Sequence, residues 1–281
     1  MSSNQISGVS FSHDEFVIDS VENCIPPRKV RDLLANRAVG LHIKSYLDPV
    51  DANRIKENFD LSDALRDRLD NVVAIKIGAD QYAKASDQYL AEVEESSLEV
   101  SKLFHKAYHI GEKARADIQA CLHQGVGLRR ADFNGHLAGD IRGVKWLGQG
   151  EFALPPHEDF SQLSHPGQTG FEIQEVETPV AFNIYPFVAP CAGNFRAYNI
   201  QPDEGTRARL NVMHTGYPYP IESLDVFQHI DVQVESGDAL LFNGRFVHGV
   251  LGKNGEGSKE RLLLNFFIGL KRGGTGVISW T

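Results

Sequence analysis

The sequence contains few cysteines and no long apolar run. Its three cysteines, Cys24, Cys121 and Cys191, are widely spaced and form neither a CxxC pair nor a zinc-finger pattern. This excludes a disulfide scaffold and favours reduced thiols. No apolar segment approaches the roughly 20 residues that span a bilayer, and residues 1–20 lack the basic and apolar regions of a signal peptide. We expect a cytosolic protein with no membrane partner.

Basic side chains are also too few for a nucleic-acid polymer to be the partner. The chain has 28 Lys and Arg residues against 37 Asp and Glu residues, a net charge of −9. Nucleic-acid binders need clustered basic side chains that release counterions from the phosphates. We therefore expect a small-molecule substrate, and an anionic one would have to be bound by individual arginines.

The length of 281 residues and the composition fit one globular domain. From residue 87 to residue 123, apolar side chains recur at three- and four-residue steps, which predicts two amphipathic helices. Gly111 is predicted to divide them, and Gly125 and Gly127 to end the second. Earlier in the chain, the run 40–43 and shorter alternating stretches predict the first strands of a sheet.

After residue 138 the sequence changes to short runs of β-branched and aromatic residues between turn residues. A series of short strands preceded by helices favours an α+β fold in which helices cover one of two packed sheets. We expect a double-stranded β-helix (jelly roll, cupin-like) core in residues 139–281. Residues 1–138 would supply mainly helical support and the first strands of the same domain. The predicted strands are 144–147, 152–154, 179–185, 194–198, 230–234, 239–242 and 262–268.

A possible metal site begins at His157-Glu158-Asp159, directly after the predicted strand 152–154. In an extended chain, side chains two residues apart share a face, so His157 and Asp159 converge while Glu158 turns away. An imidazole and a carboxylate are two of the three ligands of the facial triad that holds non-haem Fe(II) and leaves positions open. The tripeptide alone is a weak signal.

A third ligand is predicted from the segment 237–250, GDALLFNGRFVHGV. It contains an apolar strand, the pair Asn243-Gly244 and a second strand that carries His248. An Asn-Gly pair favours the positive φ angles of a tight hairpin. We therefore expect the chain to reverse there and return His248 across the sheet to complete the triad.

Arg261 follows thirteen residues after His248 and opens the apolar strand 262–268. A guanidinium forms two parallel hydrogen bonds with a carboxylate, which suits recognition of a carboxylate in a largely apolar pocket. We assign Arg261 to the distal carboxylate of a 2-oxo acid cosubstrate whose other end chelates the metal. The alternative is a surface arginine beside Lys259 and Glu260.

With these residues the chain resembles the Fe(II)/2-oxoglutarate-dependent oxygenases, whose His-x-Asp...His...Arg order is matched by His157, Asp159, His248 and Arg261. The stretches GDALLFNGRFVHGV, ERLLLNFFIGL and PFVAPCAGNFRAYN resemble the members that act on free small molecules. These include N-succinyl amino acid hydroxylases and hapalindole-type aliphatic halogenases. The resemblance implies Fe(II), 2-oxoglutarate and O2 as cofactor and cosubstrates. It also implies hydroxylation of an aliphatic C–H in an N-acylated (N-succinyl) or otherwise anionic amino acid.

One difference from the halogenases affects the predicted reaction. Those enzymes have glycine where this chain has Asp159, and chloride occupies the vacated position on iron. With Asp159 present, hydroxylation is favoured over halogenation. A related halogenating or desaturating activity is the alternative within the family. Outside the family, a zinc hydrolase and a cupin-like binding module without turnover remain alternatives.

Further side chains are candidates for the pocket. Asn183 and Tyr198 are predicted to hydrogen-bond 2-oxoglutarate. The polar segment 161–177 is either a mobile flap or an ordinary surface connection. The side chains expected to contact the substrate are apolar rings on strands near the ligands and two arginines suited to an anionic group: Phe152, Phe182, Phe246, Arg196 and Arg245.

Overall fold

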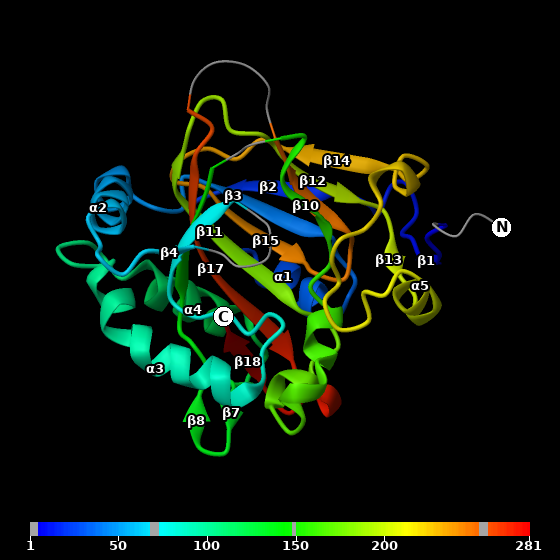
Figure 1. Cartoon of the computed structure of the whole chain (residues 1–281), viewed down its shortest axis with the longest axis horizontal. Helices are drawn as coiled ribbons and strands as arrows, with labels where there is room; N and C mark the ends of the chain where they lie inside the picture. Colours follow the sequence, from blue (N-terminus) through cyan, green and yellow to red (C-terminus); the bar gives the residue numbers. More distant parts are fainter. Residues whose placement is uncertain (1–4, 68–72, 148–149, 253–257) are drawn as a thin grey trace.

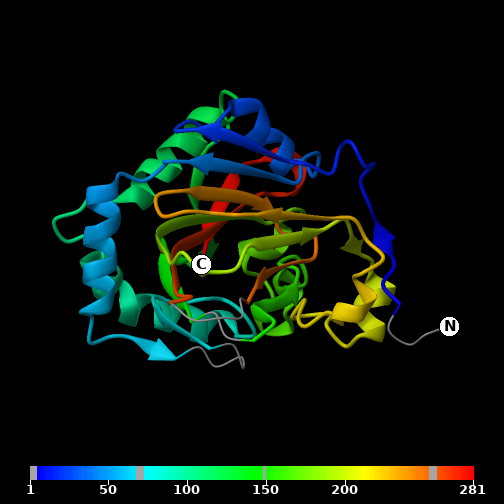
Figure 2. The ribbon, with the colours of Figure 1, turned by 90° about the horizontal axis from the view of Figure 1, so that it is seen from above.

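The computed structural model describes residues 5–67, 73–147, 150–252 and 258–281. Two sheets pack face to face, and helices cover the outer face of the larger one (Figures 1 and 2). This mixture of helices and large sheets is the α+β arrangement expected from the sequence. The helices are α1 (Pro27–Leu34), α2 (Pro49–Asp60), α3 (Ser86–Lys102), α4 (Ile110–Cys121) and α5 (Glu204–Arg209).

Helices α2 and α4 start at residues whose side chains cap them, and each buries one face. Asp48 caps α2 by accepting a hydrogen bond from the backbone N–H of Val50 at 2.8 Å. His109 caps α4 in the same way, through the N–H of Glu112. The two helices predicted between residues 87 and 123 are α3 and α4. The break between them lies before Gly111, which falls inside the first turn of α4.

The larger sheet is built around one long central strand. Its order is β2-β3-β15-β11-β17-β9-β5-β4, with β18 beside β17 and β6 beside β18. The strands are β2 (Ile18–Glu22), β3 (Gly40–Lys44), β4 (Arg66–Asp67), β5 (Ala74–Ile77), β6 (Leu128–Arg130), β9 (Arg142–Trp146), β11 (Val180–Val188), β15 (Ala239–Asn243), β17 (Arg261–Leu270) and β18 (Val277–Trp280). The central strand, β17, pairs antiparallel with both β11 and β9.

The smaller sheet has the order β10-β16-β12-β14. Its strands are β10 (Phe152–His157), β12 (Phe195–Tyr198), β14 (His229–Val232) and β16 (His248–Leu251). All seven runs predicted as strands after residue 138 overlap an observed strand. Two short pairs lie outside both sheets: β1 (Gly8–Val9) with β13 (Gln201–Pro202), and β7 (Asp132–Phe133) with β8 (His136–Leu137).

The apolar run of β17 is explained by burial on both faces. Leu262, Leu264 and Phe266 pack against the helical layer, in the cluster that includes Ile55 and Phe59 of α2. The alternate positions, such as Leu263, face the smaller sheet. A strand covered on both sides loses the alternation of polar and apolar residues. The space between the sheets therefore receives only every second side chain of β17.

The segment 161–177 is a packed connection containing three short 3-10 helices, η1 (Ser161–Ser164), η2 (Pro166–Gln168) and η3 (Glu172–Glu175). Phe171 and Ile173 are fully buried in it. Glu172 accepts hydrogen bonds from Arg129 and Lys271, which hold the pKa of its carboxyl at about 2. The burial and these ion pairs favour the ordinary connection over a mobile flap.

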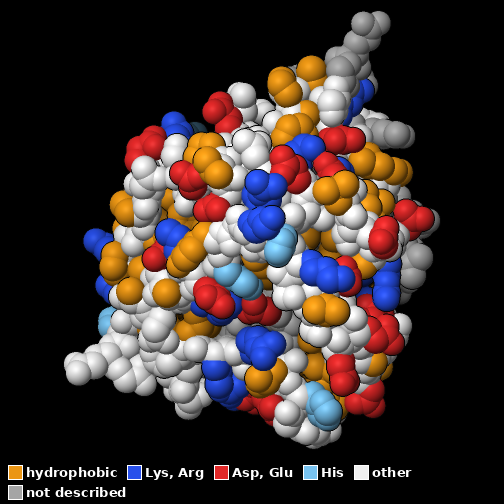
Figure 3. Space-filling model, turned by 90° about the vertical axis from the view of Figure 1, so that its left-hand side faces the viewer, with side chains coloured by type: hydrophobic (Ala, Val, Ile, Leu, Met, Phe, Trp, Pro, Cys, Tyr) orange, Lys and Arg blue, Asp and Glu red, His pale blue; other side chains and the backbone are white. Residues whose placement is uncertain are grey.

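The surface on the side of α2 and α3 is mixed in charge. Lys and Arg side chains lie among Asp and Glu side chains there, with hydrophobic ones between them (Figure 3). Within the described parts of the chain, none of the helices is both long and apolar enough to cross a bilayer.

Candidate active site

His157 is brought opposite His248 by an irregular pairing of β10 with β16. Leu154 pairs with Val250 and His157 with His248, so three steps along β10 correspond to two steps along β16. The two prolines between Leu154 and His157 cannot donate ladder hydrogen bonds, and a bulge at such a position re-aims the next side chain. As a result the two imidazole ring centroids lie 4.2 Å apart.

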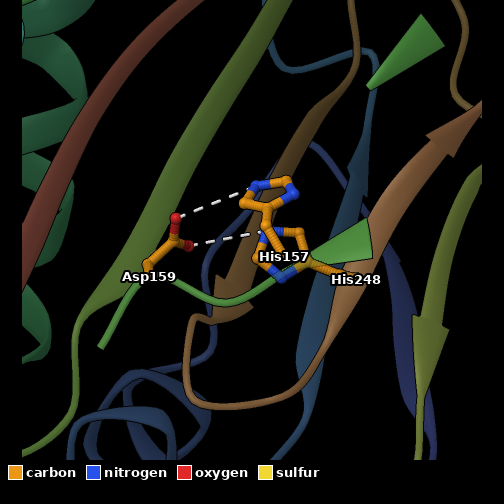
Figure 4. Close-up of side chains that lie close together, drawn as sticks. All are labelled: His157, Asp159 and His248. Carbon is orange, nitrogen blue, oxygen red and sulfur yellow. Dashed lines mark ion pairs between the residues drawn. The ribbon is translucent and has the colours of Figure 1, made fainter. Parts of the chain in front are cut away.

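Asp159 completes this group two residues beyond His157. Its carboxylate oxygens lie 4.0 Å from Nε2 of His157 and 3.5 Å from Nε2 of His248 (Figure 4). One potential ligand atom from each of the three residues lies within 4.8 Å of the other two. A single ion between them could therefore contact all three side chains.

Backbone carbonyls fix which nitrogen of each imidazole faces the group. Nδ1 of His157 donates to the carbonyl oxygen of Pro155, and Nδ1 of His248 to that of Phe246, both at 2.9 Å. Nε2 of each ring then carries its lone pair toward Asp159. Burial lowers the pKa of His248 to about 4, so its ring is neutral at physiological pH. Lone pairs that face a carboxylate repel it, and a divalent cation between them makes the contact attractive.

Glu158 and Gln162, next to the three potential metal ligands in the sequence, hold this part of the chain in place. Glu158 points away, as expected, and is fully buried, where it accepts hydrogen bonds from the backbone N–H of Ser161 at 2.9 Å and from Nε of Arg207 at 3.1 Å. Gln162 donates from Nε2 to Oδ1 of Asp159 at 3.0 Å. These contacts hold the short segment between His157 and Gln162 in one conformation.

The hairpin predicted at Asn243-Gly244 is not formed. The preceding strand β15 belongs to the larger sheet and β16 to the smaller one, so the chain crosses between sheets there. Neither residue has a positive φ angle. Glycine is required for a different reason: a Cβ at Gly244 would lie 2.6 Å from Oδ2 of Asp159. The backbone of Gly244 also accepts a hydrogen bond from the N–H of Asp159 at 2.7 Å.

The three side chains open into a pocket between the two sheets. It holds about 840 Å³ of empty space, including its open mouth. Its walls are mainly apolar side chains from the facing strands, with a few convergent polar groups. The lining includes Arg142, Trp146, Ala181, Asn183, Tyr185, Phe195, Arg261, Leu263, Asn265 and Phe267.

Arg261 lies in this pocket and is only 2% exposed. Its guanidinium donates to the carbonyl oxygen of Gly193 and stands over the ring of Tyr185, 5.6 Å from the centroid. Burial lowers its pKa, and among the described residues no acidic side chain pairs with it. Its Nε has no hydrogen-bond partner. A buried cation without an anion is costly, so this site is built to receive one.

Of the two residues predicted to hydrogen-bond the cosubstrate, only Asn183 reaches the pocket. Its Oδ1 accepts from Nδ2 of Asn265 at 2.6 Å. The structure does not bring Tyr198 there, because side chains alternate along β12 and Phe195 is the member that faces the pocket. Tyr198 packs in a separate cluster with Ile200. The tyrosine beside Arg261 is Tyr185.

The three phenylalanines expected to wall the pocket lie elsewhere. Phe182 is fully buried against the helical layer, on the face of β11 opposite Asn183. Phe152 lies beside Gly249 near the far end of β10, outside the pocket lining. Phe246 packs against Phe11 with ring centroids 5.0 Å apart. Phe182 and Phe246 therefore fill a core, Phe152 is half-buried, and none of the three lines the pocket.

The two arginines expected to bind the substrate are also engaged elsewhere. Arg196 forms two hydrogen bonds with Asp231, at 2.6 and 2.7 Å, on the strand beside it. Arg245 donates to the carbonyl oxygen of Glu177 at 2.6 Å and lies over the ring of Phe160. Neither lines the pocket.

The sequence reasoning missed Arg142, Tyr185 and Asn265, which do line it. One signal was present: Asn265 is the single polar residue inside the apolar run 262–268. Because β17 is buried on both faces, a polar side chain on it needs a hydrogen-bond partner. It therefore indicates the face of the strand that contacts a polar residue or a ligand.

Comparison with known proteins agrees with this site. No protein-family model matches the chain. Over 248 residues it is 31% identical to the L-isoleucine 3(1)-dioxygenase of Pantoea ananatis, which covers 85% of this chain and 82% of that protein. Among solved structures, an N-substituted L-amino acid dioxygenase from Burkholderia ambifaria has a TM-score of 0.56 at 13% identity, covering 91% of each chain. HygX from Streptomyces hygroscopicus, solved with nickel and 2-oxoglutarate, has a TM-score of 0.50 at 16% identity, covering 87% of each chain.

The two structures show likeness of fold alone, whereas the Pantoea relative is similar in sequence over most of both chains. The residues present fit the cofactor of such enzymes, because two imidazoles and one carboxylate are the ligand set of non-haem Fe(II). The chain belongs to the Fe(II)- and 2-oxoglutarate-dependent oxygenases and is a dioxygenase that uses Fe(II), 2-oxoglutarate and O2.

Proposed function

We propose that this dioxygenase hydroxylates an unactivated aliphatic C–H of a small free amino acid or N-acyl amino acid. The observation that carries the proposal is the convergence of His157, Asp159 and His248 on one pocket that also contains the buried cation of Arg261. The apolar lining between these groups suits an aliphatic side chain. The name of the Pantoea relative supports an amino acid as the substrate class.

The metal ligands in this proposal are Nε2 of His157, Nε2 of His248 and the carboxylate of Asp159. Arg261 pairs with the distal carboxylate of 2-oxoglutarate, and Tyr185 beside it lies within reach of the same carboxylate. Burial raises the pKa of Tyr185 to about 12, so its hydroxyl stays protonated and can donate. Asn183 remains a candidate for a second polar contact to the cosubstrate.

When bound, Fe(II) with 2-oxoglutarate and O2 supplies the oxidant, and the protein contributes positioning. Backbone carbonyls orient both imidazoles, Gln162 and the close approach of Gly244 orient Asp159, and the apolar walls exclude water. The carboxylate of Asp159 occupies the position that chloride takes in the related halogenases. Hydroxylation therefore remains our proposed outcome over halogenation.

We further propose that the two sheets form a double-stranded β-helix (jelly roll) within a single domain over residues 1–281. Support comes from the strand order. The chain fills β9-β17-β11-β15 of one sheet and β10-β16-β12-β14 of the other by crossing between the sheets at every step except from β12 to β14, which pair in the smaller sheet. Residues 1–138 then act as support for the core in residues 139–281.

A turnover screen tests the function. The Fe(II) enzyme would be given 2-oxoglutarate, ascorbate and O2 with L-isoleucine, L-leucine, L-valine, their N-succinyl derivatives or nucleotide-linked candidates. We expect succinate formation to be stimulated by at least one amino acid, with a product that gains one oxygen atom. Stimulation only by neutral scaffolds that are not amino acids would refute the substrate class. Metal binding without any loss of 2-oxoglutarate would refute the enzymatic proposal.

A further inference from the structure

Three buried glutamines, Gln162, Gln81 and Gln168, form a row of hydrogen bonds that ends at Asp159, and we call them the glutamine row. Gln162 donates from Nε2 to Oδ1 of Asp159 at 3.0 Å. Gln81 donates from Nε2 to Oε1 of Gln162 at 2.7 Å, and Gln168 donates from Nε2 to Oε1 of Gln81 at 3.0 Å. The three residues are 7%, 1% and 0% exposed. A buried amide is costly unless it is hydrogen-bonded, so these side chains are placed for their hydrogen bonds.

Both ends of the glutamine row require the same direction of hydrogen bonding. An ionised carboxylate only accepts, so Gln162 must turn its NH2 group toward Asp159 and its oxygen toward Gln81. At the other end, the NH2 group of Gln168 also donates to the backbone carbonyl oxygens of Gln81 at 2.8 Å and Lys84 at 3.1 Å. Gln81 therefore presents its nitrogen to Gln162 and its oxygen to Gln168. If its amide turned over, it would lose both bonds.

The backbone around the glutamine row is fixed by further contacts. The N–H of Gln81 donates to the backbone oxygen of Thr281 at 3.0 Å, directly after strand β18 of the larger sheet. Gly167, next to Gln168, packs so closely on Ala85 that an added Cβ would lie 3.1 Å from its Cα and Cβ. The loop between β5 and α3 is thus held both by the larger sheet and by the connection that contains Gln168.

The hydrogen bond from Gln162 sets the direction of the Asp159 carboxylate. It is made to Oδ1, whereas Oδ2 lies 3.5 Å from Nε2 of His248. A carboxylate that is held at one oxygen does not turn freely about its Cβ–Cγ bond, so this hydrogen bond also places the other oxygen. Successive hydrogen bonds polarise one another, which strengthens the last one in the row. Outer hydrogen-bond partners orient metal ligands in this way.

We propose that Gln81 and Gln168 are positioning residues that act through Gln162 on Asp159, an inference that rests on the metal ligands of the proposed function. Gln162 contacts Asp159 directly, and the other two glutamines fix which way its amide faces. Glutamine is required at position 81 because its side chain donates on one side and accepts on the other. An apolar side chain does neither, and an ionised carboxylate only accepts.

Substitutions at Gln81 separate positioning from packing. Glutamate has nearly the shape of glutamine, but its carboxylate would compete with Asp159 for the NH2 group of Gln162. Methionine is similar in length and apolar, and it leaves Gln162 able to donate to Asp159. The variants are therefore Gln81→Glu and Gln81→Met, each alone and combined with Gln162→Met. The matched control is Gln174→Glu, because Gln174 lies in the same connection but donates to the carbonyl oxygen of His165 at 3.1 Å, outside the glutamine row.

An anaerobic Fe(II) titration in the presence of 2-oxoglutarate gives the dissociation constant of each protein, followed by the metal-to-ligand charge-transfer absorption. Melting curves identify a temperature at which all of them are folded. We expect Gln81→Glu to weaken Fe(II) binding by about ten- to hundredfold, the range for loss of an outer hydrogen-bond partner. Gln81→Met should weaken it by less, and Gln174→Glu should match the wild type. With Gln162→Met already present, neither substitution at Gln81 should weaken binding further, because residues that act through one contact are not additive.

A packing role predicts the opposite order, since glutamate replaces the shape of glutamine better than methionine does. Wild-type Fe(II) affinity in Gln81→Glu would overturn the proposal. An effect of Gln81→Glu that is equally large with Gln162→Met present would overturn it as well. The proposed ligands fail separately: they are refuted if the wild type takes up no Fe(II). If His157→Ala abolishes uptake and Gln81→Glu leaves it unchanged, the ligands stand and the role of the glutamine row is refuted.

A measurement on the wild-type protein decides the matter if Gln81→Glu does not fold. NMR of the side-chain amides follows Gln162, Gln81 and Gln168 while Zn²⁺ is added to the metal-free protein. We expect the nitrogen shifts of all three to change, although only Gln162 contacts a proposed ligand. The shift of Gln119, on the exposed face of α4, should stay constant. A change at Gln162 alone would overturn the proposal.

Discussion

Replacing Gly244 by alanine places a methyl group against Asp159. The new Cβ would lie 2.6 Å from Oδ2 and 2.7 Å from Cβ of Asp159. Carbon atoms in contact are normally about 3.5–4.0 Å apart, so one partner must move by roughly 1 Å. The backbone of Gly244 is held on both sides, since its N–H donates to Pro179 at 2.8 Å and its carbonyl accepts from Asp159 at 2.7 Å. The carboxylate is therefore the group that moves.

A metal site tolerates ligand displacements of only about 0.2 Å. We expect Gly244→Ala to reduce Fe(II) affinity by about ten- to hundredfold, as loss of a supporting contact does. Overpacking should also lower the free energy of unfolding by about 1–3 kcal/mol. Because φ at Gly244 is not positive, backbone strain does not contribute. Gly127→Ala is the matched control, since its Cβ would meet nothing within 4 Å.

The assay is an anaerobic Fe(II) titration of wild type, Gly244→Ala and Gly127→Ala at a temperature where all three are folded, with melting curves recorded alongside. Gly244→Ala should bind Fe(II) more weakly, and Gly127→Ala should match the wild type. Wild-type affinity in Gly244→Ala would refute the reasoning, because the carboxylate would then have moved without consequence for the metal.

Three further predictions concern the metal, the cosubstrate and acid stability. Asp159→Gly should abolish most hydroxylation and open a position for chloride, measured by product analysis with and without chloride. Unchanged hydroxylation would refute the ligand assignment. Arg261→Gln should raise the KM for 2-oxoglutarate by about ten- to hundredfold, whereas a change in substrate KM alone would contradict its assignment. The pKa of Glu172 in the folded protein, about 2, lies below the ordinary glutamate value of 4.5, so its stabilisation is present above pH 4.5 and is lost as pH falls toward 2. Glu172→Gln should therefore melt at a lower temperature than wild type at pH 7 and at a similar one near pH 2. A constant difference at both pH values would contradict the assignment.

The strands were predictable because their signals are local. Each run after residue 138 combines β-forming residues with turn residues at its ends, and each overlaps an observed strand. The turn at Asn243-Gly244 was not predictable in this way, because its geometry depends on which sheets the two flanking strands join. That pairing is set by contacts with β11 and β10, which are distant in sequence. The sequence pattern indicated a glycine at position 244 for a hairpin turn. In the structure a glycine is needed there because Gly244 lies close to Asp159.

In the candidate site, too, the local sequence pattern predicted some residues and long-range packing decided the others. The meeting of His157, Asp159 and His248 could be predicted, because their residue types and order are typical of a metal site and of few other arrangements. The pocket walls depend on which face of each strand is turned inward, and a shift of one residue reverses that face. Phe182 and Asn183 were both predicted for the pocket, but they lie on opposite faces of β11 and only Asn183 lines it; Tyr198 was predicted there as well, and the tyrosine that lines it is Tyr185. Burial of β11 on both faces removes the alternation that would have told Phe182 from Asn183.

The remaining question is whether the three converging side chains hold one Fe(II) together with the keto acid. An anaerobic titration of Fe(II) into the metal-free protein with 2-oxoglutarate present measures this most directly. We predict saturation at one Fe(II) per chain with a charge-transfer absorption, and loss of both in His157→Ala and His248→Ala. Absence of saturable uptake, or an absorption that survives in both variants, would contradict the account.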